Sequence, residues 1–297
     1  MKKVKEYIVN FINGFCMALA DSVPGVSGGT IAFILGFYDN FIGALDDLFR
    51  GKVEEKKKAI IYLIKIGIGW IVGFALSATI LSTLFETKIY SMSSLFIGFI
   101  LLAIPLVIKE EKEVLKGKYK NLVFLILGIA LVVGISLLTN LEVFSVDITK
   151  PNILTYIYIF AAAAIAITAM VLPGISGSTL LLIFGLYIPI MGYVKRFFSL
   201  DFSVIPVLIV FGLGIIFGIV FFVKIIRKCL SSYRSQTIYA IIGMMIGSFY
   251  AIILGPTTLD VPLEMLTFKT FDILFFVIGC VVIIGLEFIK KLMLTNE

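Results

Sequence analysis

Apolar stretches long enough to cross a lipid bilayer recur along the whole of this chain. A helix needs about 20 mainly apolar residues to cross the ~30 Å hydrocarbon core of a bilayer. Six segments meet this requirement, at residues 59–84, 90–108, 121–140, 203–226, 237–254 and 271–290. Only 15% of the residues are charged, compared with about 25% in soluble proteins. The sequence therefore predicts an all-α polytopic membrane protein and argues against a soluble enzyme.

Two further regions, residues 7–46 and 153–194, are apolar but interrupted at their centres. The interruptions contain Pro24 and Gly25 in the first region, and Pro173 and Gly174 in the second. Proline removes a backbone hydrogen-bond donor and glycine frees the backbone, so a continuous helix breaks there. Each region is predicted to form a re-entrant hairpin, in which two helical arms enter and leave the membrane on the same side.

The distribution of basic residues supports this topology. If both broken regions return to the side from which they enter, 19 of the 25 lysine and arginine residues lie on one face of the membrane. Cytoplasmic loops are enriched in lysine and arginine, so we expect both termini to be cytoplasmic. The net charge of +6 does not indicate nucleic-acid binding, because the basic residues cluster in short loops between apolar runs.

The two broken regions have similar sequences. Residues 24–38 align with residues 173–187 at a constant offset of 149, and eight of these fifteen positions are identical. Each copy is followed by three predicted spans, so residues 1–140 and 141–297 are expected to form two repeats of a single membrane domain. Because three is an odd number, the second repeat is inverted relative to the first. Inverted repeats with broken helices that meet near the bilayer midplane are typical of transporters.

The centres of both broken regions, called the first and second tips below, contain residue types that bind anions. A new helix is expected to begin near Gly28 and near Gly177, and its first N–H groups have no partner within the helix. Such donors, together with hydroxyl groups, form phosphate sites. The predicted phosphate-binding residues are Ser27, Gly28, Gly29, Thr30, Ser176, Gly177, Ser178 and Thr179. The same hydroxyl groups could instead cap the helices, and one hydroxyl can do both.

The doubled Pro-Gly-x-Ser-Gly-x-Thr motif, followed in the first copy by Gly36, Phe37 and Tyr38, resembles the polyprenyl-phosphate transporter family (PopT) over essentially the whole chain. The resemblance implies a bacterial plasma-membrane protein that returns undecaprenyl phosphate, the lipid carrier of cell-wall precursors, from the outer leaflet to the inner one. It also suggests a similarity to DedA-type lipid transporters, which use re-entrant hairpins. The implied partners are the polyprenyl phosphate lipid and the bilayer, while the oligomeric state stays open.

Two alternatives from other functional classes remain. Membrane undecaprenyl-pyrophosphate phosphatases also have inverted repeats and carry a Pro-Gly-x-Ser-Arg-Ser motif, but Gly28 and Gly177 stand at the arginine position here. The glutamate cluster of such an enzyme is missing too, so the charge of the transition state would not be neutralised. We therefore predict that the protein is not an enzyme. A carrier of small anions would suit the same tips.

Two charged residues lie in apolar surroundings, where charges are rare and usually functional. Asp21 precedes the first tip, and its counterpart in the second repeat is Met170. One hypothesis is that Asp21 takes up or releases a proton as the phosphate moves. The alternative is that it caps the broken backbone through the N–H groups of Ser22 or Val23. Lys65 is a candidate counter-charge for the phosphate, or a lysine that reaches the membrane surface along its own helix.

The remaining polar residues give little indication of a second site. We expect Asp39, Asp46 and Asp47, which follow the first hairpin near a basic loop, to form a solvated face. The chain has no histidine, and its three cysteines are far apart in the sequence. A zinc site of the usual Cys/His kind therefore cannot be assembled, and the sequence predicts neither a metal nor a cofactor.

Overall fold

The structure is a computed structural model that describes residues 2–21, 27–77, 82–139, 148, 151–258 and 262–294. Over these residues the chain is helical and contains no strand. The first half contains α1 (Lys2–Asp21), α2 (Gly28–Ile34), α3 (Tyr38–Arg50), α4 (Val53–Leu76), α5 (Ser82–Glu110), α6 (Lys112–Leu115), η2 (Tyr119–Asn121) and α7 (Leu122–Thr139). The second half contains α8 (Ile153–Val171), α9 (Gly177–Ile183), α10 (Tyr187–Phe198), η3 (Phe202–Val204), α11 (Ile205–Ser232), α12 (Arg234–Leu254), η4 (Gly255–Thr258) and α13 (Ile273–Leu294).

Six helical segments of the described chain are long and apolar enough to cross a membrane, which confirms the multi-pass prediction. They are Val53–Leu76, Thr87–Glu110, Tyr119–Leu138, Ile153–Val171, Phe202–Ser232 and Arg234–Thr257. Helix α9 and residues Tyr187–Val194 form a further apolar pair, bent by 108° at the break between them. Helix α13, predicted as a full span at 271–290, instead contributes a shorter apolar stretch, Ile273–Gly285, within the described residues.

Some helix boundaries differ from those predicted, because charged residues extend the helices beyond their apolar parts. The span predicted at 59–84 begins six residues earlier as α4, where the backbone N–H of Lys52 donates to the Glu55 carboxylate over 2.6 Å. Helix α11 continues to Ser232 through a basic stretch, since lysine and arginine are good helix formers. Helix α8, predicted as one arm of a broken region, has 19 residues and is itself long enough for a span.

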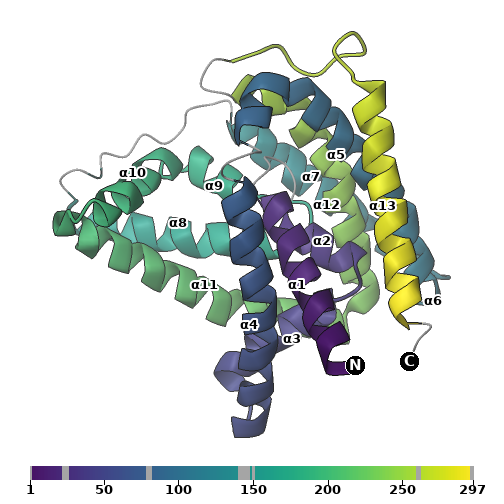
Figure 1. The fold of residues 1–297 in the computed structure, drawn as a ribbon, viewed down its shortest axis with the longest axis horizontal. Coiled ribbons are helices and arrows are strands. Elements are labelled where there is room, and N and C mark those ends of the chain that lie inside the picture. The colour runs from purple at the N-terminus through teal and green to yellow at the C-terminus, as the bar shows by residue number, and fades with distance from the viewer. Residues whose placement is uncertain are drawn as a thin grey trace.

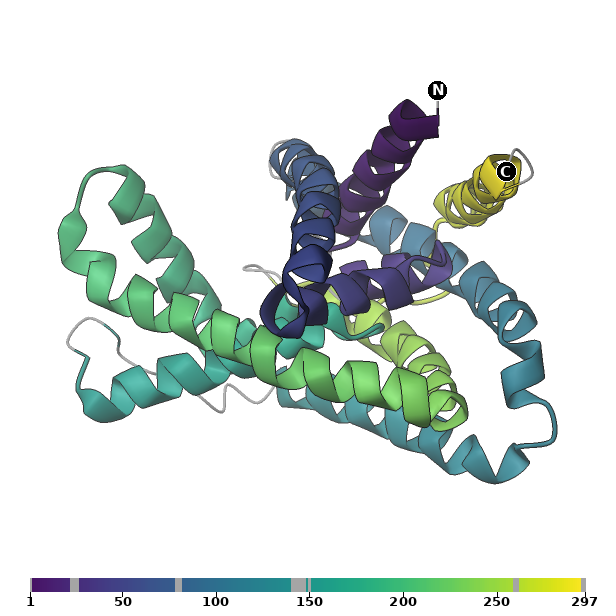
Figure 2. The same cartoon turned by 90° about the horizontal axis from the view of Figure 1, so that it is seen from below.

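The helices are arranged in pairs (Figure 1). Helices α5 and α13 lie side by side, as do α7 and α12, while α1 and α4 pack together near the middle of the molecule. Helices α8 and α11 pack against each other and extend to one side with α10, which is also evident from below (Figure 2). The start of α1 and the end of α13 lie at the same end of the molecule.

Helices α1 and α4 run in the same direction and pack through small residues. A Cβ atom on Gly69 would lie 2.0 Å from the carbonyl oxygen of Phe11, and one on Gly73 would lie 2.7 Å from that of Phe15. A step of four residues along one helix therefore matches a step of four along the other. Because two consecutive long helices both start at the same end, the chain must return to that end through α2 and α3.

Helices α8 and α11 repeat this arrangement. A Cβ atom on Gly214 would lie 2.4 Å from the carbonyl oxygen of Phe160, and one on Gly218 would lie 2.6 Å from that of Ala164. Phe160 and Ala164 lie 149 positions after Phe11 and Phe15, the same offset that relates the two tips. The chain again returns, through α9 and α10, to the end from which it started.

The other two pairs each join the two halves of the chain. In the α5–α13 pair, a Cβ atom on Gly98 would lie 2.2 Å from the carbonyl oxygen of Phe276. In the α7–α12 pair, a Cβ atom on Gly243 would lie 2.1 Å from that of Leu125. In both pairs, a glycine of one helix thus faces a backbone carbonyl of a helix from the other half of the chain. The halves are therefore interleaved and do not form separate bodies.

Candidate functional site

The two tips lie against each other in the hydrophobic core. The hydroxyl of Ser27 donates to the carbonyl oxygen of Leu172 over 2.9 Å. The backbone N–H of Gly174 donates to the hydroxyl oxygen of Thr30 over 2.8 Å. All seven residues of α2 are buried, as are Ser27 and Ser176. The structure therefore brings together the two interruptions, which are about half the chain apart in sequence.

These contacts form a continuous chain of hydrogen bonds, which we call the tip relay. The hydroxyl oxygens of Ser27 and Thr30 are 3.1 Å apart. Because Ser27 gives its only hydroxyl proton to Leu172, the hydroxyl of Thr30 must donate to Ser27. The relay thus runs from the N–H of Gly174 through Thr30 and Ser27 to the carbonyl of Leu172. Ser27 also accepts a hydrogen bond from the N–H of Thr30 over 3.2 Å, so it caps α2 in the way that the capping alternative requires.

The second tip differs from the first at its helix start. Helix α9 begins at Gly177 as predicted, but the side chain of Ser176 makes no capping hydrogen bond. Its hydroxyl oxygen instead lies 2.7 Å from that of Ser178. Within the described residues, no group accepts a hydrogen bond from the N–H groups of Gly177 or Ser178. Ser178 and Thr179 are also only half-buried, so this tip has donors available for a ligand.

Two glycines allow the tips to approach each other and their surroundings closely. A Cβ atom on Gly29 would lie 2.3 Å from the carbonyl oxygen of Val171. Gly174 has a φ of +87°, and a Cβ atom there would collide with the backbone of Met244. Pro173 precedes it and is buried. The predicted break residues of the first tip, Pro24 and Gly25, lie outside the described residues.

Asp21, at the end of α1, contacts the start of α2. Its carboxylate accepts a hydrogen bond from the N–H of Gly28 over 2.7 Å and from the indole Nε1 of Trp70 over 3.0 Å. The Asp21 carboxylate thus already accepts the hydrogen bond from the Gly28 N–H, which we predicted would bind the phosphate. The capping alternative named Ser22 and Val23, which lie outside the described residues, whereas Gly28 is the donor seen here. The sequence interpretation did not include Trp70, although a buried indole N–H usually requires a partner.

Lys65 lies away from both tips. Its Nζ atom is 2.8 Å from the Glu6 carboxylate and 4.2 Å from the centre of the Tyr7 ring. Glu6 and Asp21 are fifteen residues apart on α1, or about 22 Å along a helix. In this conformation, Lys65 therefore pairs with a residue near the start of α1, whereas the tip follows the end of that helix.

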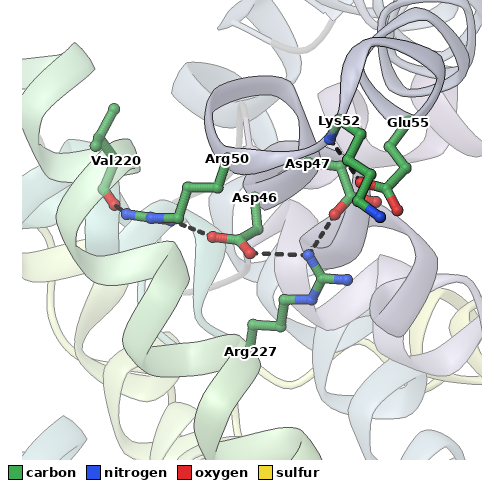
Figure 3. A network of polar contacts seen from close by, with 7 residues as sticks. All are labelled: Asp46, Asp47, Arg50, Lys52, Glu55, Val220 and Arg227. Atoms are coloured by element: carbon green, nitrogen blue, oxygen red, sulfur yellow. Dashed lines mark hydrogen bonds and ion pairs between the residues drawn. The ribbon is translucent and has the colours of Figure 1, made fainter.

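Of the acidic residues of α3 that were predicted to form a solvated face, Asp39 is exposed, but the prediction is wrong for Asp46. Asp46 is buried, and its carboxylate contacts Arg50 on the same helix and Arg227 on α11 (Figure 3). Arg227 also pairs with Asp47, and Arg50 donates to the carbonyl of Val220. The sequence could not indicate this, because the partner helix α11 is about 180 residues away. Helix α3 is therefore held by ion pairs to the second half of the chain.

Asp39, at the start of α3, is held in a similar way. Its carboxylate pairs with Arg234 at the start of α12 over 2.7 Å, and Arg234 also pairs with Glu111, just after α5. The end of α5 and the start of α12 therefore meet. Helix α5 therefore runs towards this end of the molecule and α12 runs away from it (Figure 1).

The site contains backbone donors, hydroxyl groups and one carboxylate. No lysine or arginine occurs in the described residues of either tip, and the described chain has no group of three or more acidic, cysteine or histidine residues that could hold a metal ion. Such a set can bind and release an anion through hydrogen bonds. Within the described residues, neither tip has a lysine or histidine beside its serines that could activate one of them as a nucleophile.

Comparisons with known proteins agree with this chemistry. Residues 17–269 match the model of a family described as undecaprenyl phosphate translocase-like. A protein of Vibrio cholerae named polyprenyl-phosphate transporter is 33% identical over 256 residues, which cover 83% of this chain and 77% of that protein. A protein of Staphylococcus aureus with the same name is 31% identical over 250 residues, which cover 84% of this chain and 87% of that protein. No solved structure matches the chain. From the extent of the family match and the identity to both relatives, we conclude that the chain belongs to the undecaprenyl phosphate translocase-like family.

Proposed function

We propose that the protein translocates polyprenyl phosphate, and specifically undecaprenyl phosphate, across the bacterial plasma membrane. The family and the names of two relatives support the substrate. The observation that supports the mechanism most directly is the contact between two tips rich in hydrogen-bond donors within a multi-pass helical protein. A phosphate bound between them would be shared by both halves of the chain, so its movement would be coupled to the movement of one half against the other.

We infer a topology of two inverted repeats, residues 1–140 and 141–297, with re-entrant hairpins at 7–46 and 153–194. The parallel pairs α1–α4 and α8–α11 support the hairpins, because the chain between each pair must return to its starting end. The opposite directions of α5 and α12 support the inversion. The clustering of basic residues supports a cytoplasmic location for both termini.

For the phosphate we propose binding by Ser27, Gly28, Gly29 and Thr30 of the first tip and by Ser176, Gly177, Ser178 and Thr179 of the second. The N–H groups of Gly177 and Ser178 have no acceptor in the described structure, which favours the second tip as the initial contact. Helices α2 and α9 have only seven residues each. Individual hydrogen bonds therefore contribute more to this site than a helix dipole does.

The contact between Asp21 and Gly28 suggests how a proton could be coupled to this movement. The carboxylate and the phosphate are both anions, and both would bind the Gly28 N–H group. Protonation of Asp21 would weaken its hold on that donor and remove the repulsion between the two anions. We propose that Asp21 takes up a proton as phosphate binds the first tip and releases it as the phosphate leaves. Lys65 is not assigned a role in binding, because it pairs with Glu6.

A phosphatase function has less support. Hydrolysis of a pyrophosphate requires neutralisation of charge in the transition state, whereas the described tips provide one carboxylate and no basic side chain. The family is one of translocases, and both relatives are named as transporters.

Exchange of labelled undecaprenyl phosphate between leaflets tests the function. The protein would be reconstituted into vesicles with the labelled lipid in one leaflet, and we expect much faster exchange than in protein-free vesicles. Undecaprenol and inorganic phosphate serve as separate cargoes. No acceleration for undecaprenyl phosphate would refute the proposal, and equal acceleration for inorganic phosphate would favour the small-anion carrier.

The serines at the starts of α2 and α9 test the site, because only Ser27 caps its helix. Ser176→Ala should weaken binding of undecaprenyl phosphate roughly ten- to a hundred-fold, because a hydrogen bond to a charged group is lost. The melting temperature should change little, because this substitution removes no capping bond. Ser27→Ala should weaken binding to a similar extent and also destabilise the fold, by about 1–3 kcal/mol, because it interrupts the tip relay. Effects on affinity should be non-additive in the double variant, since both serines would bind one phosphate. Ser136→Ala, at a buried serine on α7, is the control, and wild-type affinity in all variants would exclude the tip serines as ligands.

A further inference from the structure

A cavity of about 640 Å³ adjoins the second tip. It lies between α3, α7, α8, α11 and α12, and its walls are mainly apolar. Two of its lining residues connect it to the tips. Leu172 accepts the last hydrogen bond of the tip relay, and the backbone of Met244 abuts Gly174. A ligand in this cavity would therefore lie directly beside the proposed phosphate site.

Tyr38 lines the same cavity and is the first residue of α3. Its side chain is 1% exposed, and its hydroxyl has no hydrogen-bond partner in the described structure. Burial of a hydroxyl without a partner is unfavourable, so native proteins usually provide one. An acceptor atom of a ligand that reached the hydroxyl from the cavity would satisfy this group. Tyr62 also has a buried hydroxyl without a partner, but it lines a different cavity, between α3 and α4.

The far side of the cavity leads to a basic surface. A second pocket, of about 570 Å³, shares Ile225, Cys229 and Tyr233 with the cavity. This outer pocket is lined by Lys224 and Lys228, which are exposed and form no ion pair within the described residues. The exposed apolar rings of Phe217 and Phe221 lie in the same wall. A ligand with an anionic group and a long apolar tail complements this combination.

Charge distinguishes this route from the apolar pocket on the other side of α8. That pocket, of about 360 Å³, is lined by Asp21 and by no basic residue. An anionic headgroup would be repelled by the ionised carboxylate there and attracted by the lysines of the outer pocket.

We propose that the 640 Å³ cavity holds the part of the polyprenyl phosphate nearest the headgroup, and that Tyr38 is a binding residue for the phosphate. This inference rests on the proposed function and adds an entry route to it. The headgroup meets Lys224 and Lys228, passes inward to the tips and accepts a hydrogen bond from the Tyr38 hydroxyl. The first isoprene units follow and fill the apolar cavity, while the rest of the tail leaves between α11 and α12 towards the lipid.

Tyr38→Phe tests the hydroxyl with the smallest possible change. Binding of undecaprenyl phosphate to the purified protein should weaken roughly tenfold or more, as for the loss of a hydrogen bond to a charged group. The melting temperature should stay the same or rise, because the variant removes an unsatisfied buried hydroxyl. Tyr62→Phe is the matched control and should leave the affinity unchanged. An unchanged affinity in Tyr38→Phe, or an equal loss in both variants, would overturn the assignment of Tyr38.

Protection of Cys229 tests the cavity independently. In a protein with Cys16→Ala and Cys280→Ala, Cys229 is the remaining thiol, and it lines both the cavity and the outer pocket. Undecaprenyl phosphate should slow its alkylation by a maleimide at least tenfold. Undecaprenol should protect only at higher concentration, and inorganic phosphate should not protect.

The outcomes separate this inference from the proposed function. If the lipid binds and the tip serine variants weaken it, but Cys229 is alkylated at the same rate with and without lipid, the function stands and the cavity is not the route. If undecaprenol protects as well as undecaprenyl phosphate, the phosphate contact at Tyr38 is refuted. If the wild-type protein binds no undecaprenyl phosphate, the proposed function and this inference both fail.

Discussion

At the scale of single residues, one difference makes the two tips unequal. Asp21 provides a carboxylate for the N–H of Gly28, whereas the equivalent residue of the second repeat, Met170, cannot accept a hydrogen bond of comparable strength. The side chain of Met170 instead packs near Gly177. The N–H of Gly28 is therefore satisfied by the protein itself, whereas the N–H groups of Gly177 and Ser178 have no acceptor within the described residues. The two copies of the motif therefore differ in which of their N–H groups are available to a ligand.

Asp21→Asn should uncouple transport from pH. Asparagine keeps an oxygen for the Gly28 N–H but does not titrate. We therefore expect leaflet exchange by the variant to depend little on pH from mildly acidic to mildly alkaline conditions, a range over which the proposed coupling predicts a change in the wild-type rate. A pH profile of the variant that matches the wild type would exclude Asp21 as the coupling residue.

Asp201 provides the control for this experiment. Hydrogen bonds from Ser203 and Arg196 lower the pKa of Asp201 to about 2. Because the pKa is lower in the folded state, any stabilisation from this carboxylate is present above its unfolded pKa of about 3.9 and is lost as the pH falls towards 2. Asp201 stays ionised throughout the range measured, so Asp201→Asn should leave the pH profile of exchange unchanged.

At the scale of helices, close glycine contacts hold the two halves together. Gly98 of α5 and Gly243 of α12 each face a backbone carbonyl of the partner helix. Small residues at helix contacts allow this approach in membranes, where association depends on packing. The helices would have to separate to admit a methyl group.

Gly98→Ala and Gly243→Ala should destabilise the protein by similar amounts, about 1–3 kcal/mol each, as other overpacked cores do. Gly134→Ala on α7 is the control, because a Cβ atom there meets nothing within 4 Å and alanine favours a helix. Thermal unfolding in detergent measures all three. A stability of Gly243→Ala equal to that of Gly134→Ala would show that α7 and α12 do not pack as described.

The helices themselves could be predicted from the sequence, but their partners could not. Apolar length located five of the six span-length segments, with α8 as the exception, and the Pro-Gly interruptions located the helix starts at Gly28 and Gly177, since these features depend on local composition. The environment of Asp46 depends instead on which helix packs opposite α3, and that is determined by residues far away in the chain. The role of Trp70 escaped prediction for the same reason, because its partner Asp21 lies on another helix.

At the scale of the whole molecule, the proposed topology predicts which loops face each side of the membrane. In a protein without its three native cysteines, Ser199→Cys should react with a membrane-impermeant thiol reagent added outside cells. Lys118→Cys should react only after the membrane is opened. Lys118 lies between α6 and η2, and Ser199 follows α10. Equal labelling of both from one side would show that the hairpins are assigned wrongly.

The tip relay has a consequence for the cell's energy supply. A bacterium stores energy as ion gradients across the membrane that this protein spans, and a water-filled gap between the tips would dissipate them. In the relay, the polar groups of one half bind those of the other, so separation of the empty tips would leave several buried groups without partners, at about 1–3 kcal/mol each. A phosphate offers acceptors to the same donors and reduces that penalty. The lipid would thus help to open the path that it takes, and the unloaded protein would stay sealed against protons and salts.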